Sequence, residues 1–93
     1  MIVSFKSKIA EALFNDLKPK KFPSDLFQVS RRKLLMIHAA QKIEDLRVPQ
    51  GNRLESLKAD RKGQHSIRIN DQWRICFYFK NGQAFDVEIV DYH

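Results

Sequence analysis

The chain has 93 residues, of which 43% are hydrophobic and 11% aromatic, so residues 1–93 are expected to form one small folded domain. No apolar run approaches the roughly 20 residues that a membrane-spanning helix needs. The single cysteine, Cys76, excludes an internal disulfide and a cysteine-based zinc site, and it favours a reducing, cytoplasmic setting.

Positive charge is concentrated before the last eleven residues. Residues 1–82 hold all 17 Lys and Arg against 8 Asp and Glu, whereas residues 83–93 hold none against 3. A basic body with a formal charge of +6 favours a polyanionic partner, most often nucleic acid. The alternative is a basic protein that binds no polyanion. Net charge alone is a weak indication of nucleic-acid binding.

The first forty residues predict two helices. Residues 2–5 are a candidate edge strand, and the apolar residues that recur every fourth position from Ser7 to Leu17 predict an amphipathic helix. Pro19 and Pro23 end it. Ser24 is the expected N-cap of a second helix that runs to about Gln41 and has one apolar face.

Residues 47–64 predict a basic loop between the helices and the sheet. Pro49, Gly51 and Gly63 mark turns. The loop has five cations: Arg47, Arg53, Lys58, Arg61 and Lys62. Composition alone allows two interpretations. The loop is either a solvated connection without a binding role or a loop that binds a polyanion.

Three strands are expected at the C-terminal end, over residues 65–69, 73–79 and 84–90. A two-residue Asn81-Gly82 turn would place Glu88 opposite Ile75, beside the aromatic residues. A three-residue turn, Lys80 to Gly82, pairs Ile75 with Val87 and separates apolar from polar residues, so this register is predicted.

This register gives the antiparallel sheet two different faces. The two helices should cover the apolar face, and the fold class is therefore α+β. The other face should be open and basic. It is expected to carry Ser66, Arg68, Arg74, Cys76, Tyr78, Asp86, Glu88 and Tyr92.

The chain ends in Asp91, Tyr92 and His93, three side chains that can transfer or orient a proton. RNA can be cleaved without a metal when its 2′-OH attacks the adjacent phosphate. This reaction requires proton acceptors, proton donors and cations around the phosphate. Arg74, Arg68, Lys58 and Arg61 can supply the cations, since the planar guanidinium of arginine matches phosphate oxygens. A solvated polar chain end is the alternative.

Several segments together resemble the HigB branch of the RelE toxin superfamily. They are residues 1–5, the Gly51-Asn52-Arg53-Leu54-Glu55 stretch, residues 61–77 with their Trp-Arg-Ile strand, Asn81-Gly82, and residues 86–93 ending in Asp-Tyr-His. The resemblance covers the whole chain. It implies two helices on an antiparallel sheet, in a toxin of a bacterial type II toxin–antitoxin module.

The resemblance also implies an activity and a site. Toxins of this family are metal-independent endoribonucleases that need no cofactor and cleave mRNA in the A site of the translating ribosome. Their partners are the ribosome with its mRNA and 16S rRNA, a helix-turn-helix antitoxin of the HigA type, and operator DNA through the antitoxin complex. The family's catalytic residues match Lys58, Arg74, Asp91, Tyr92 and His93. Arg53, Arg61, Lys62 and Arg68 are candidate RNA-binding residues.

The chain departs from the family at Glu55, where some relatives have a histidine. Glu55 could act as a base, hold Lys58 by a salt bridge, or weaken the activity, and the assignment of general acid and base stays open. A weakened toxin is therefore one alternative. A non-catalytic module that binds RNA or the ribosome is the other.

Overall fold

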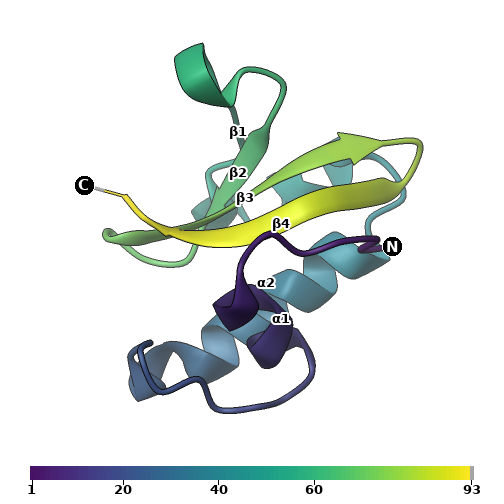
Figure 1. Cartoon of the computed structure of the whole chain (residues 1–93). Coiled ribbons are helices and arrows are strands. Elements are labelled where there is room, and N and C mark those ends of the chain that lie inside the picture. Colours follow the sequence, from purple (N-terminus) through teal and green to yellow (C-terminus); the bar gives the residue numbers. More distant parts are fainter. Residues whose placement is uncertain (93) are drawn as a thin grey trace.

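The computed structural model describes residues 1–92, so the predicted role of His93 lies outside the described residues. Two helices lie on one side of a four-stranded antiparallel sheet, and the loop around residues 57–63 rises on the other side (Figure 1). The strands follow one another in chain order: β1 (Glu55–Ser56), β2 (His65–Arg68), β3 (Trp73–Lys80) and β4 (Gln83–Asp91). The α+β prediction is confirmed.

Helix α1 (Lys8–Phe14) is shorter than the predicted span from Ser7 to Leu17. Ser7 caps it, since its Oγ accepts a hydrogen bond from the amide of Ala10 at 3.0 Å. The chain turns through Asp16, whose φ is 61°, and therefore leaves the helix before Leu17 and both prolines. Leu17 is consequently exposed.

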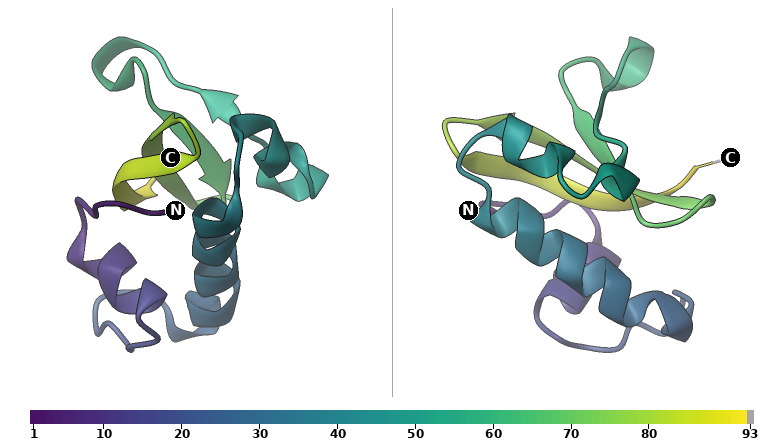
Figure 2. Two further views of the ribbon diagram at one scale, coloured as in Figure 1. Left: turned by 90° about the vertical axis from the view of Figure 1, so that its right-hand side faces the viewer. Right: turned by 180° about the vertical axis from the view of Figure 1, so that it is seen from behind.

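Helix α2 (Phe27–Ala39) crosses beneath the sheet (Figure 2). A 3₁₀ turn over residues 24–26 precedes it, so the prediction of Ser24 as the N-cap is wrong. The turn follows Pro23, whose carbonyl accepts from the Leu26 amide. Further 3₁₀ turns cover residues 43–47, 50–52 and 59–61.

The core lies between the helices and the sheet. Leu13, Leu34 and Ile37 from the helices meet Ile67, Ile75 and Phe77 from the strands, and all six are buried. Burial of such side chains contributes about 1.5–3 kcal/mol each. The predicted edge strand also joins the sheet, because Ile2 and Phe5 bridge in parallel to Ala84 and Val87 of β4.

The predicted register of the last hairpin is wrong. Lys80 pairs with Gln83 around a two-residue Asn81-Gly82 turn, and a β-bulge then shifts the pairing so that Ile75 faces Ile89. Asp86 supplies the extra residue, with a φ of 52°. The bulge lets the two-residue turn coexist with the pairing of the apolar residues Ile75 and Ile89.

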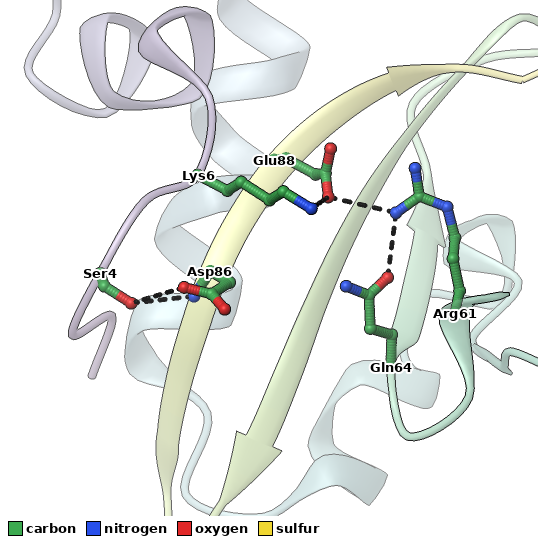
Figure 3. Close-up of polar contacts among 6 residues, drawn as sticks. All are labelled: Ser4, Lys6, Arg61, Gln64, Asp86 and Glu88. Atoms are coloured by element: carbon green, nitrogen blue, oxygen red, sulfur yellow. Dashed lines mark hydrogen bonds and ion pairs between the residues drawn. The ribbon is translucent and has the colours of Figure 1, made fainter.

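The bulge is held by the N-terminal segment. The Asp86 amide donates to Ser4 Oγ at 2.9 Å, and this hydroxyl donates in turn to Asp86 Oδ1 at 3.4 Å (Figure 3). Upstream of the bulge, Phe85 pairs with Tyr78 on the outer face. Downstream, Arg74 pairs with Val90 and Glu88 pairs with Cys76.

The outer face of the sheet is also less open than predicted. Ser66, Arg74 and Cys76 are buried at its centre. Residues 53–64, which belong to the basic loop predicted over residues 47–64, cover part of this face and contribute β1, which adds a fourth strand. Leu57 is buried, and Gly63 lies beside the Tyr78 ring.

Candidate active site

Arg74 on β3 is the most constrained cation on the outer face, with only 7% of its surface exposed. Its Nε donates to Ser66 Oγ at 2.9 Å, and its Nη2 donates to the Arg53 carbonyl oxygen at 2.7 Å. Glu55 Oε1 lies 3.4 Å from the same Nη2. The two hydrogen bonds and this ion pair fix both the position and the plane of the guanidinium.

The local backbone explains how these acceptors meet. Ser66 lies on β2 beside β3, two residues before Arg68, which pairs with Arg74. Side chains two residues apart on a strand share a face. Arg53 follows a 3₁₀ turn in a left-handed conformation with φ 45° and ψ 56°, and its carbonyl accepts from Arg74.

Tyr92 completes this group from the end of the chain. The Arg74 guanidinium carbon lies 5.8 Å from the centre of the Tyr92 ring, within the range of a cation–π contact. Tyr92 is 40% exposed, so its phenol is accessible to a ligand. The predicted proximity of Arg74 and Tyr92 is therefore confirmed. A fixed cation, a phenol and the carboxylate of Glu55 share one site, hereafter the Arg74 site.

Asp91 does not belong to this group. It pairs with Trp73 across the strands, and the Gln72 side-chain amide donates to Asp91 Oδ2 at 3.2 Å. Consecutive strand residues point to opposite faces, so the side chain of Asp91 is directed away from Tyr92 and Arg74.

Lys58 is exposed at the start of the 3₁₀ turn over residues 59–61. Its ammonium makes no hydrogen bond or ion pair with any residue from 1 to 92. A salt bridge from Glu55 to Lys58 was one predicted alternative, but Glu55 pairs with Arg74 instead. The lysine is therefore carried by the loop without a fixed polar partner among the described residues.

Two predicted RNA-binding arginines have protein partners, and Arg61 is the more firmly held. Its Nη1 donates to Gln64 Oε1 at 3.0 Å and to Glu88 Oε2 at 3.1 Å, and Lys6 Nζ lies 3.7 Å from the same Glu88 oxygen (Figure 3). Burial opposes the charge of Arg61 and is the largest single influence, but the hydrogen bond to Glu88 and the charges of Cys76, Glu88 and Tyr92 together outweigh it and raise the pKa of Arg61. Arg61 therefore ties the loop to β4.

The other predicted RNA-binding cations are more accessible. Arg68 pairs with the exposed carboxylate of Asp71, and this surface pair leaves the guanidinium partly exposed. Arg53 and Lys62 are exposed. Exposed ion pairs contribute little to stability, so Arg68 could exchange Asp71 for a phosphate at small cost.

Ser66 and the backbone of Arg53 were missed as ligands of Arg74. Ser66 was placed on the correct face by alternation, yet nothing in its type distinguishes it from a solvated serine. Cys76, beside it, is buried, and burial raises the pKa of its thiol. The thiol is therefore neutral near pH 7.

Within residues 1–92, no three His, Cys, Asp or Glu side chains gather closely enough to hold a metal ion. No helix in that part of the chain is long and apolar enough to cross a membrane.

The chain is similar to known toxins along its whole length. A family model described as "RelE-like toxin of type II toxin-antitoxin system HigB" matches residues 3–93. Toxin HigB-1 of Vibrio cholerae serotype O1 is 40% identical over 87 residues, which are 92% of each chain. Endoribonuclease HigB of Proteus vulgaris is 37% identical over 93 residues and all of both chains.

The fold has a solved counterpart. The YoeB–YefM complex from Staphylococcus aureus contains a chain that aligns with a TM-score of 0.58 at 16% identity, covering 100% of this chain and 98% of that one. At this identity the likeness concerns the fold alone. The family match and the two curated relatives carry the assignment. This chain belongs to the HigB family of RelE-like toxins of type II toxin–antitoxin systems.

Proposed function

We propose that this toxin is a ribosome-dependent endoribonuclease that cleaves mRNA in the ribosomal A site by attack of the 2′-OH on the adjacent phosphate. The observation that carries the proposal is the Arg74 site, where a fixed guanidinium lies beside a phenol and a carboxylate. The relative from Proteus vulgaris, named an endoribonuclease, supports this reaction class.

Arg74 stabilises the charge that develops on the phosphorane. Its Nη1 donates to no described residue, and that edge of the guanidinium is left for phosphate oxygens. A cation already oriented before the substrate binds loses no energy to reorganisation during the reaction. Lys58 brings a second charge from the loop and follows the RNA backbone.

Tyr92 and His93 manage proton transfer, and Glu55 is the candidate base closest to Arg74. Asp91, held by Gln72, orients the chain end. This set contains no strongly activated base, so we expect the ribosome to align the 2′-OH for attack. The remaining partners proposed are a helix-turn-helix antitoxin and, through it, operator DNA, in the bacterial cytoplasm.

The test is single-turnover cleavage of mRNA on programmed ribosomes, with naked mRNA as a parallel substrate. Arg74→Ala and deletion of Tyr92 and His93 should each slow cleavage strongly. If either variant stays within about threefold of the wild-type rate, the catalytic assignment fails. Ribosome binding without new mRNA 5′ ends would identify a binding module instead.

A further inference from the structure

Lys33 on α2 is a buried cation that the proposed reaction does not use. Only 6% of its surface is exposed, and no carboxylate of residues 1–92 contacts its ammonium. Its Nζ donates to Asn52 Oδ1 at 2.6 Å. A buried ammonium without an anionic partner destabilises a fold, and an apolar side chain of similar length would fit such a place at lower cost.

Asn52 is itself fully buried and has a fixed orientation. Its Nδ2 donates to the carbonyl oxygens of Leu46 and Val48 at 3.2 and 3.5 Å. With the amide nitrogen used in this way, Oδ1 points to Lys33. The asparagine thus ties the 3₁₀ turns over residues 43–52 to each other, and Lys33 ties them to α2.

Arg53, the residue after Asn52, connects this cluster to the Arg74 site. Arg53 follows Asn52 in its left-handed conformation, and its carbonyl oxygen accepts the 2.7 Å hydrogen bond from Arg74 Nη2. Lys33, Asn52, the Arg53 backbone and Arg74 therefore form a continuous series of bonds. Burial, and then the charges of Arg32, Arg68 and Arg74, lower the pKa of Lys33, which agrees with its closeness to the site.

We propose that Lys33 is a positioning residue for catalysis: its hydrogen bond to Asn52 holds the Arg53 carbonyl where it orients the Arg74 guanidinium toward the RNA phosphate. This inference rests on the proposed endoribonuclease function. A positioning role explains why a lysine occupies this buried position, where an apolar side chain would pack equally well and would be less costly to bury.

The Lys33→Met variant tests it, because methionine retains an unbranched stem and loses the ammonium. We expect a melting temperature equal to or above that of the wild type, since an unpaired buried charge is removed. We also expect single-turnover cleavage on ribosomes to slow by about tenfold or more, because Arg74 loses its fixed orientation. Arg32→Met is the matched control: it removes an exposed cation from the same helix and should stay within about twofold.

A double-variant cycle with Arg74→Ala separates positioning from a general defect. If Lys33 acts through Arg74, Lys33→Met should not slow the Arg74→Ala variant further. A Lys33→Met rate within about twofold of the wild type would overturn the inference, as would an equal slowing in both backgrounds.

A second measurement does not depend on cleavage. The ¹H–¹⁵N NMR signal of Arg74 Nε, assigned by its loss in Arg74→Lys, should shift and exchange faster with solvent in Lys33→Met. If wild-type toxin fails to cleave RNA, the proposed function fails, whereas an unchanged Arg74 signal overturns the positioning role. Should Lys33→Met not fold, Asn52→Ser withdraws the acceptor from Lys33 because the serine side chain is shorter, and the cycle and the spectrum apply to it unchanged.

Discussion

Arg74 and Lys58 are both candidate phosphate-binding cations, but their surroundings differ. Arg74 is buried on β3 and bound by Ser66, the Arg53 carbonyl and Glu55. Lys58 is exposed on a loop that is fixed at its base, where Arg61 reaches Glu88. One cation is placed before the substrate arrives, whereas the other can adjust to it.

This difference suggests a division of labour within one site. A guanidinium with fixed partners can stabilise charge that appears only in the transition state. A flexible lysine contributes mainly to binding, because it follows the phosphate wherever the backbone lies. Substitutions at the two positions should therefore affect different kinetic constants.

The largest effect is expected from Arg74→Lys. Lysine keeps the charge, but its single nitrogen cannot reproduce the separate bonds of Nε and Nη2. The single-turnover rate on saturating ribosomes should fall by about 100-fold or more. Arg32→Lys, which alters an exposed arginine on α2, is the control. Equal effects of the two variants would remove the distinction between fixed and adjustable cations.

A smaller effect is expected from Lys58→Ala. Apparent affinity for the programmed ribosome should weaken by about tenfold at low salt, and the dependence of binding on salt should become shallower by about one phosphate contact. Titrations at several salt concentrations measure both. If Lys58→Ala lowered only the maximal cleavage rate and left ribosome affinity unchanged, Lys58 would act as Arg74 is proposed to act, in the transition state and not in binding.

Glu88→Gln should loosen the base of the loop. The glutamine side chain keeps the shape of the glutamate but lacks its charge, which weakens the bonds from Arg61 and Lys6. Glu88 is largely buried, so the free energy of unfolding in urea should fall by about 1–2 kcal/mol. Trypsin should also cut the loop faster. Asp71→Asn removes a carboxylate from an exposed ion pair and should change stability little.

The smallest effect concerns the pH dependence of stability and rests on His65, the first residue of β2. Burial lowers the pKa of His65 below 6.5, so the unfolded chain takes up a proton more readily than the folded one. The stability that neutral His65 confers is therefore complete above pH 6.5 and is lost as the pH falls below this value. Urea unfolding of the wild type and of His65→Asn near pH 7.5 and pH 5 should show a smaller loss for the variant.

Element types and the buried face of the sheet were predictable because they follow from periodicity. Alternation placed Ile67, Ile75 and Arg74 on their correct faces, and Ile67 pairs with Ile75. The two-residue strand β1 was missed because Glu55 and Ser56 carry no strand pattern. Their pairing with β2 comes from the tertiary structure.

The β-bulge was not predictable from the hairpin alone. The choice between a two-residue and a three-residue turn assumed one register for the whole hairpin, and Asp86 changes the register within it. Its support comes from Ser4, which is distant in sequence. The same holds for the Arg74 site, since a backbone carbonyl and a serine have no distinguishing signature. The resemblance supplied the expectation that Arg74 and Tyr92 act together.

The bulge at Asp86 also bears on how such toxins diversify. The bulge determines on which face of the sheet each later side chain of β4 lies. One inserted or deleted codon at this point would therefore move each of these side chains to the opposite face. Tyr92 now lies beside Arg74, and a shift by one residue would present Asp91 there instead. A phenol would then be replaced by a carboxylate without any point mutation in the site. Length variation near residue 86 is therefore a route by which a gene lineage could alter its chemistry.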